Sequence, residues 1–400
     1  MTIRRRSLLA GSTMLLGAGL PAIGRAQGAP ITLGILTALT GAGAADGPRM
    51  AKAMQAVGSQ INAAGGLNGR PLRFVVEDDQ TNPEGAVRAA RKLVDVDKVP
   101  VIMGTWASAV TSAVAPVCWE SRTFLTTCSG ADTITQLPHD GYLIRTQPNS
   151  QLQGRRHAEF MGSLGAKRVF VMSLQSPFAL PTQNRIKEVL PQHGSEMVGA
   201  LIYEKDKSSY RSEIDQALKT KPDMMYLNGY SPDLTVLLRE LYRAGYEGGK
   251  FSQSYALTEK VVESLPKEVV EGAYNVQPSA DADSPAFENA TKLLGHAPDS
   301  YEAQSVDWIS LVALTIAKAA ANGEPVTGKL LRDNVRRVSQ GDGEKVYTVL
   351  DGLKLLSAGK EINYQGVSGP CDFTPIGDIE DCRFRFSQVK GGKINLLKVS

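Results

Sequence analysis

The sequence predicts an α/β protein with two lobes, each built on a doubly wound parallel sheet. Short apolar stretches of strand length alternate with helical patterns of ten or more residues, which is typical of parallel sheets covered by helices on both faces. The alternation runs as far as Arg145 and then starts again. The chain has 400 residues, 42% of them hydrophobic, which is enough for two such lobes.

The first run of elements shows the periods expected of strands and helices. Met50, Met54, Val57 and Ile61 recur every three or four residues, which predicts one buried helix face. Asn82, followed by a proline, begins the next helix. The predicted elements are strands at 31–36, 72–76, 99–103 and 123–127, and helices at 48–64, 82–96 and 108–120.

The second run repeats the alternation and then changes character. It comprises helices at 151–162, 181–192, 210–220 and 232–244, and strands at 168–173, 197–203, 223–228 and 250–254. Two long helices at 301–321 and 327–338 follow. The tail, 371–399, turns to short strands with glycine turns. This change predicts a chain that crosses between the lobes more than once.

Charge and hydropathy exclude several classes of protein. Lys and Arg number 44 and Asp and Glu 41, so no basic surplus points to nucleic acid. No internal apolar run reaches the roughly 18 residues needed to span a bilayer, which argues against a polytopic membrane protein.

Residues 1–26 have the pattern of an export signal. Arg4, Arg5 and Arg6 precede an apolar run, and the segment ends with small residues around a cleavage site near Ala26. The paired arginines also match a twin-arginine signal, with an arginine-rich general secretory signal as the alternative. Removing the segment leaves 40 basic and 41 acidic residues. We therefore expect a protein exported to the periplasm.

Export makes disulfides plausible for the four cysteines. Three pairings are possible, and we expect the local one, Cys118 with Cys128 and Cys371 with Cys382, which closes two short loops. Buried free thiols are the alternative. No C-x2-C or H-x3-H spacing supports zinc.

The strand-to-helix junctions are the places where this architecture binds ligands. Ligands bind beyond the carboxyl ends of parallel strands, where a helix N-terminus offers unpaired N–H groups to an anion. Three junctions have suitable loops, at 40–47, 104–108 and 128–132. Ser108 stands at a predicted helix N-cap, so its hydroxyl and the next amides could hold an anion. The alternative is that Ser108 only caps its own helix.

Signals for catalysis or a cofactor are weak. None of the four histidines belongs to an H-E-x-x-H motif, and no G-x-S-x-G motif is present. The glycines at 41 and 43 resemble a dinucleotide fingerprint, but the third glycine is missing. We therefore expect neither an enzyme nor a cofactor.

Several segments, taken in order, resemble the periplasmic substrate-binding proteins of ABC transporters of the branched-chain-amino-acid type. The segments are 31–37 (ITLGILT), 61–72 (INAAGGLNGRPL), 77–83 (EDDQTNP), 101–104 (VIMG) leading to Ser108, 145–149 (RTQPN), 221–223 (KPD) and 364–378 (YQGVSG, then F-x-x-x-GD). The resemblance spans nearly all of residues 30–400.

The resemblance implies two lobes joined by a three-crossover hinge, which close on one small ligand in the cleft between them. The implied N-terminal lobe comprises 27–146 and 277–378, and the C-terminal lobe 147–276 and 379–400. The implied partners are a small-molecule ligand and the membrane permease subunits of an ABC importer. The protein is expected to be a monomer and to bind no nucleic acid.

The resemblance also implies a set of ligand-binding residues. Ser108 matches the serine that binds the ligand carboxylate, and the other matched positions are Asp46, Trp106, Ala107, Gly130, Ala131, Asp132, Phe178, Tyr230 and Tyr255. Tyr255 stands near the position where amino-acid binders carry the acid that neutralises the ammonium.

This departure leaves the ligand class open. Asp132 or Asp46 could take the ammonium of an amino acid or a derivative. The ligand could instead be an aromatic or other small organic acid, or an amide or polyol-like molecule. The expected function is a solute receptor of an importer, and the alternative is a periplasmic sensor on the same fold that signals to a membrane receptor.

Overall fold

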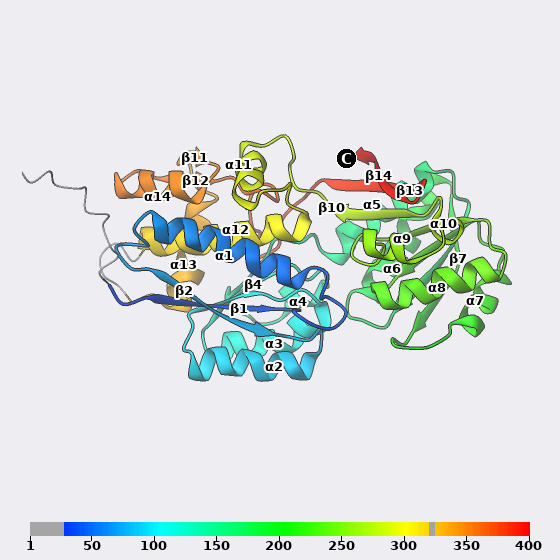
Figure 1. The fold of residues 1–400 in the computed structure, drawn as a ribbon, viewed down its shortest axis with the longest axis horizontal. Helices are drawn as coiled ribbons and strands as arrows, with labels where there is room; N and C mark the ends of the chain where they lie inside the picture. The colour runs from blue at the N-terminus through cyan, green and yellow to red at the C-terminus, as the bar shows by residue number, and fades with distance from the viewer. Residues whose placement is uncertain (1–27, 320–324) are drawn as a thin grey trace, which may run out of the picture.

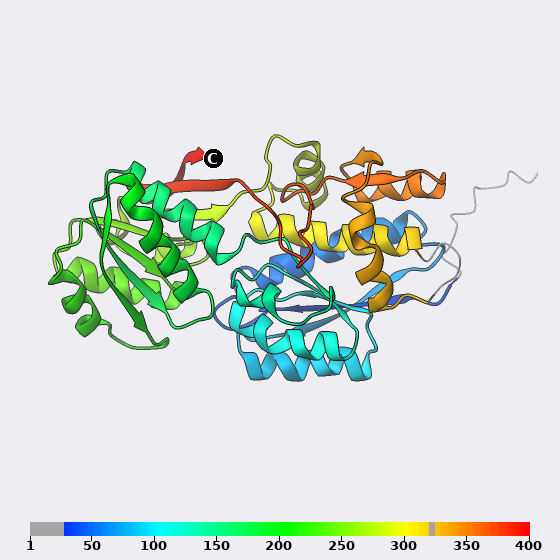
Figure 2. The same cartoon turned by 180° about the vertical axis from the view of Figure 1, so that it is seen from behind.

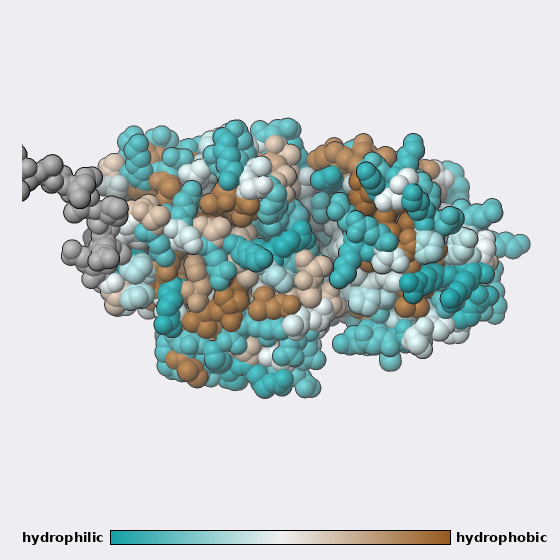
Figure 3. All heavy atoms as spheres, viewed as in Figure 1, coloured by the Kyte–Doolittle hydropathy of each residue, from teal (hydrophilic) through white to brown (hydrophobic). Residues whose placement is uncertain are grey.

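The computed structural model describes residues 28–319 and 325–400, and the predicted signal at 1–26 lies outside them. As predicted, two α/β lobes lie side by side (Figure 1). Figure 3 shows the furrow between them, with hydrophilic residues predominating on the surface to either side. Among the described helices, none is long and apolar enough to cross a membrane.

The first lobe is built on a five-stranded parallel sheet of order β2-β1-β3-β4-β5. Its strands are β1 (Ile31–Thr37), β2 (Leu72–Asp78), β3 (Val101–Gly104), β4 (Phe124–Thr127) and β5 (Leu143–Arg145). Its main helices are α1 (Gly47–Ala63), α2 (Pro83–Arg91), α3 (Ser108–Glu120), α11 (Pro285–Leu294), α12 (Ser300–Ala319), α13 (Gly328–Asn334) and α14 (Val349–Ser357). Shorter elements are η1 (Lys92–Val96), α4 (Thr133–Gln136), η3 (Val335–Val338) and the pair β11 (Glu344–Val346) and β12 (Ile362–Tyr364).

The second lobe repeats the strand order of the first and adds a hairpin. Its sheet runs β7-β6-β8-β9-β10-β13-β14, parallel except at β13 and β14. Its strands are β6 (Arg168–Leu174), β7 (Glu196–Tyr203), β8 (Met224–Asn228), β9 (Gly249–Gln253), β10 (Tyr274–Pro278), β13 (Phe384–Lys390) and β14 (Lys393–Val399). Its helices are α5 (Ser150–Ser163), α6 (Ala179–Val189), η2 (Leu190–His193), α7 (Arg211–Leu218), α8 (Ser231–Arg243), α9 (Glu259–Ser264) and α10 (Lys267–Val270).

The strand order places the ligand cleft. In each sheet the first strand of the lobe lies second from one edge. The next strand in the chain lies on one side of it and the strand after that on the other, so the direction of the chain connections reverses at this point. Ligands bind at such a reversal, beyond the carboxyl ends of the strands. These ends are β1 and β3 in one lobe and β6 and β8 in the other.

The chain crosses between the lobes three times, after β5, after β10 and before β13. Figure 2 shows the last of these crossings as the red segment that passes from one lobe to the other. The tail therefore completes the second sheet. The lobe boundaries expected at 146, 276 and 378 stay a prediction.

The predicted disulfides are wrong, because all four cysteines are free. Cys118 lies near the C-terminal end of α3, whereas Cys128 follows β4 and its Sγ lies 3.6 Å from the Thr105 carbonyl oxygen. Because β4 runs back along α3, the two thiols lie at opposite ends of one unit. Cys371 belongs to the first-lobe core, and Cys382 packs against a second-lobe cluster.

Arg145 anchors the hinge. Its side chain is fully buried, and its Nε and Nη2 donate to Asp378 Oδ1 at 2.8 and 2.6 Å. Its Nη1 donates to the carbonyl oxygens of Ser129 and Ala131, and its Nη2 also donates to Thr135 Oγ1. One side chain therefore joins the first crossover, the third crossover and the loop after β4.

The acidic motif at the end of β2 fixes a second loop of the first lobe. Asp78 accepts from the backbone N–H groups of Leu39 and Thr40 and thus holds the loop after β1. Asp79 is fully buried, and its Oδ1 accepts from the Thr81 N–H at 2.7 Å, but its Oδ2 has no hydrogen-bond partner among the described residues. Burial, with a smaller effect of Asp78, raises the pKa of Asp79 to about 6.

Asp378→Asn should lower the free energy of unfolding by about 3–5 kcal/mol, because it leaves the buried Arg145 guanidinium without a counter-charge. Urea unfolding measures this loss. Asp372→Asn is the matched control, since its carboxylate is exposed on the same segment. The control should change stability by less than about 0.5 kcal/mol. Equal effects of the two variants would contradict an anchoring role for Arg145.

Asp79→Asn should flatten the pH dependence of stability. A folded-state pKa near 6, above the ordinary 3.8, means that Asp79 contributes stability below pH 4 that is lost as the pH rises through 6. The wild type should therefore lose about 2 kcal/mol more than Asp79→Asn between pH 4 and pH 7 in urea unfolding. The exposed Asp140→Asn should keep the wild-type slope, and an unchanged slope in Asp79→Asn would contradict this assignment.

Candidate ligand-binding site

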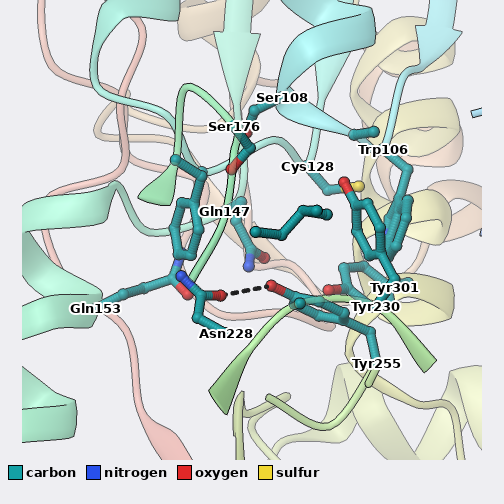
Figure 4. Close-up of a pocket in the computed structure, with 15 residues that line it drawn as sticks. Trp106, Ser108, Cys128, Gln147, Gln153, Ser176, Asn228, Tyr230, Tyr255 and Tyr301 are labelled. Atoms are coloured by element: carbon teal, nitrogen blue, oxygen red, sulfur yellow. Dashed lines mark hydrogen bonds between the residues drawn. The ribbon is translucent and has the colours of Figure 1, made fainter. Parts of the chain in front are cut away.

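A cavity with about 510 Å³ of empty space, which includes the solvent at its open mouth, lies between the carboxyl ends of the two sheets (Figure 4). From the first lobe and its crossover it is lined by Trp106, Ala107, Ser108, Cys128, Gly130, Gln147 and Tyr301. From the second lobe it is lined by Gln153, Leu174, Ser176, Phe178, Asn228, Gly229, Tyr230 and Tyr255. Seven of the ten residues predicted to bind the ligand are thus brought together here, and their role as ligand contacts stays a prediction.

The N-terminus of α3 opens onto the cavity. Ala107 is the N-cap residue and Ser108 is the first helical residue, so Ser108 does not cap its own helix. Its Oγ instead accepts from the Ala131 N–H at 3.2 Å, which leaves the hydroxyl hydrogen for another acceptor. The first amides of α3 have no partner within the helix and carry partial positive charge. This end of the cavity is therefore suited to a carboxylate.

Buried hydroxyl groups fix the two loops that carry this helix end. Thr105 Oγ1 lies 2.6 Å from Thr111 Oγ1, and Thr127 Oγ1 donates to the Thr105 carbonyl oxygen at 2.8 Å. Ser129 Oγ donates to the Trp106 carbonyl oxygen at 2.9 Å. The loops after β3 and β4 are therefore tied together beneath the cavity, and α3 is held in place by them.

Aromatic rings form one side of the cavity and meet across the cleft. Trp106 of the first lobe lies 5.3 Å from Tyr230 and 5.4 Å from Tyr255 of the second, measured between ring centroids. Tyr301 packs edge-on against Trp106 at 6.0 Å. Burial raises the pKa of all three tyrosines, so their phenol groups are neutral at physiological pH. These contacts give the cleft an apolar face with neutral hydroxyl groups.

On the side of the cavity opposite Trp106, the close packing leaves room only for a glycine at position 130. A Cβ at Gly130 would lie 2.7 Å from Phe178 Cε2 and 2.8 Å from Gln153 Nε2, closer than such contacts allow. Gly130 thus lets two second-lobe side chains approach the loop after β4. Gln153 Nε2 donates to the Pro148 carbonyl oxygen at 2.7 Å.

Among the described residues that line the cavity, none has an acidic or basic side chain. Asp46 does not line it. Its carboxylate pairs with Arg49 at 2.8 Å, and burial together with the nearby Asp299 raises its pKa to about 6. Asp132 does not line it either, and accepts from the backbone N–H and Nε2 of Gln151. Ala131 is not a lining residue, and its N–H donates to Ser108 Oγ.

Sequence reasoning did not identify eight lining residues. They are Cys128, Gln147, Gln153, Leu174, Ser176, Asn228, Gly229 and Tyr301. Asn228 and Gly229 stand at the predicted end of a strand, and Gln147 belongs to the segment RTQPN, so position alone could have pointed to them. Tyr301 lies in a long helix and has no such signal.

Comparison with known proteins agrees with this fold. A family model described as "Periplasmic binding protein" matches residues 30–393. The chemotactic signal transduction system substrate-binding protein BasB of Halobacterium salinarum is 26% identical over 368 residues, covering 87% of this chain and 84% of that protein. An amino acid binding protein of Pseudomonas aeruginosa is 23% identical, covering 79% of this chain and 86% of that protein.

Solved structures share the fold at low identity. A leucine-binding protein, LivK, of Thermotoga maritima has a TM-score of 0.77 at 20% identity, over 92% of this chain and 98% of that chain. A solute-binding protein of an ABC transporter from R. palustris, in complex with benzoate, has a TM-score of 0.73 at 20% identity, over 92% and 96%. Proteins of this family and fold are binding proteins rather than enzymes. The two lobes, the cavity between them and the family match over residues 30–393 show that this chain belongs to the periplasmic binding protein family.

Proposed function

We propose that this protein is the solute receptor of an ABC importer and that its ligand is a small aromatic carboxylate without an α-ammonium group. One observation carries the ligand class. A helix N-terminus suited to a carboxylate faces a cavity with five aromatic side chains and no acidic or basic side chain among its described lining residues. The segment 1–26 is proposed as the export signal of a periplasmic monomer, with lobe boundaries at 146, 276 and 378.

The absence of charged side chains from the described lining argues against a free amino acid as the ligand. An ammonium group buried between the lobes needs a counter-charge, because an unpaired buried charge is costly. Asp46 and Asp132, the two acids considered for this role, both lie outside the lining and are engaged by Arg49 and Gln151. A carboxylate has partners in the α3 amides and the Ser108 hydroxyl.

Aromatic rings on both lobes suit a flat ligand. Rings stack or meet edge to face at centroid distances of 4.5–7 Å, and Trp106, Tyr230 and Tyr255 already have this spacing across the cleft. A ligand that touches both lobes binds the closed form better than the open form and so shifts the protein towards closure. The closed form is the one proposed to meet the permease.

The structural neighbours include proteins with ligands of this class. Solute-binding proteins from R. palustris are described in complex with benzoate and with 4-hydroxybenzoate. Others are leucine-binding, and all are about equally distant from this chain. The uncharged lining favours the first group.

A second candidate function is sensing on the same fold. The relative BasB is described as the substrate-binding protein of a chemotactic signal transduction system. Cross-linking of the liganded protein in its own cells separates the two functions: capture of permease subunits supports import, and capture of a membrane receptor instead supports sensing.

A thermal-shift panel on the mature protein tests the ligand class. Benzoate and 4-hydroxybenzoate at about 100 times their Kd should add about 2.7 kcal/mol of stability. Leucine, which lacks the aromatic ring, and benzamide, which lacks the carboxylate, should add much less at the same concentrations. Stabilisation by leucine alone would overturn the proposed class.

Ser108→Ala should weaken benzoate binding by about tenfold, because one hydrogen bond to the carboxylate is lost. Isothermal titration calorimetry measures the change. Ser121→Ala, at the opposite end of α3, is the control and should bind as the wild type does. Asp132→Asn should leave benzoate binding intact, whereas a loss of binding there would indicate that Asp132 belongs to the binding site.

A further inference from the structure

Four buried side chains form a hydrogen-bonded chain from the first-lobe core to the cavity. Trp308 Nε1 donates to Thr146 Oγ1 at 2.9 Å, and Thr146 Oγ1 donates to Gln304 Oε1 at 2.9 Å. Gln304 Nε2 donates to Gln147 Oε1 at 2.7 Å. None of the four is more than 4% exposed, and Gln147 is the member that lines the cavity.

The two hydrogen bonds of Thr146 fix the direction of the bonds in this chain. An indole N–H can only donate, so Thr146 Oγ1 accepts from Trp308. Among the described residues, Gln304 Oε1 is the one acceptor within hydrogen-bond distance of the Thr146 hydroxyl, so this hydroxyl donates to it. The Gln304 oxygen is therefore the atom facing Thr146, and its Nε2 faces Gln147. This Nε2 also donates to Ser300 Oγ at 3.3 Å, so both of its hydrogens are used. The oxygen of Gln147 must then point at Gln304.

The other end of the Gln147 amide has no such partner. Its Nε2 makes no hydrogen bond to a described residue. This atom is also not completely buried, so it remains accessible from the cavity. In Figure 4, Gln147 lies between Ser108 at one end of the cavity and Asn228 at the other. An N–H donor is thus held at mid-cavity.

We infer that Gln147 is a specificity-determining residue: the hydrogen-bonded chain from Trp308 locks its amide so that it donates to the ligand and accepts nothing from it. The inference rests on the proposed function. It requires an oxygen acceptor on the ligand at this point, either the second carboxylate oxygen or an oxygen on the ring. An ammonium or amide N–H placed there would face another donor and be rejected.

The position of Gln147 also connects ligand recognition to the hinge. Thr146 and Gln147 follow Arg145 directly on the first crossover. A ligand that accepts from Gln147 therefore holds a hinge residue as well as the two lobes.

Side-chain amide exchange in the ¹⁵N-labelled protein tests the orientation without a ligand. Gln147→Leu and Gln304→Met assign the two NH₂ signals by their disappearance. The Gln304 NH₂ should be protected from exchange, and the Gln147 NH₂ should exchange at least tenfold faster. Protection of Gln147 with exposure of Gln304 would overturn the inference, whatever the ligand is.

Binding tests the contact itself. Benzoate should shift and protect the Gln147 NH₂ signal and leave that of Gln304 in place. Gln147→Leu should weaken benzoate binding by about tenfold or more, the effect of one hydrogen bond to a charged group. Gln304→Met should weaken it less, because Gln147 keeps its donor and loses only its orientation. Unchanged binding of both benzoate and 4-hydroxybenzoate in Gln147→Leu, or an equal loss in both variants, would overturn the inference.

Failure of the proposed function has a different signature. If neither benzoate nor 4-hydroxybenzoate binds the wild type, the proposed ligand class is wrong. The shift of the Gln147 NH₂ signal and the binding of Gln147→Leu and Gln304→Met are then measured with leucine. A Gln147 NH₂ that leucine protects supports the donor role without an aromatic ligand. A bound leucine that leaves this signal unmoved rejects the donor role as well.

Discussion

The guanidinium of Arg145 lies where the first and third crossovers meet, and each of its five N–H groups has an acceptor. Two of these N–H groups bind Asp378, and two hold the carbonyl oxygens of Ser129 and Ala131. The Ala131 N–H in turn binds Ser108 Oγ at the start of α3. A buried charge is tolerated only with such complete pairing, and here the same pairing holds the end of the cavity at α3 to the hinge.

Charged side chains are absent from the described lining of the cavity. Asp46 is paired with Arg49, and Asp378 with Arg145. What remains inside is the partial charge of a helix end, hydroxyl and amide groups, and aromatic rings. The described lining offers hydrogen-bond donors suited to an anion and contains no charged side chain that could pair with a cation.

Much of the secondary structure was predictable because single elements follow local rules. The helix expected at 108–120 is observed as Ser108–Glu120, and Asn82 caps α2 by accepting from the Gly85 N–H, as expected. The three-residue β5 was not predicted, because so few residues show no period, and the five-residue β10 was not predicted either. Of the site, Ser108, Trp106 and Tyr230 followed from the resemblance, whereas Tyr301 reaches the cavity only through the packing of α12.

By itself, the sequence determined the two runs of alternating elements, the junctions where a ligand can meet a helix end, and the resemblance carried by segments such as 61–72 and 77–83. These depend on neighbours in the chain. Only the tertiary structure decided which thiols, charges and amides meet. Cys118 and Cys128 are close in sequence but lie at opposite ends of one unit, and Arg145 and Asp378 are 233 residues apart but in contact. The reason is physical: the contact of Arg145 with Asp378, and the hydrogen bonds that orient Gln147, join residues far apart in the chain and exist only once these segments have packed together.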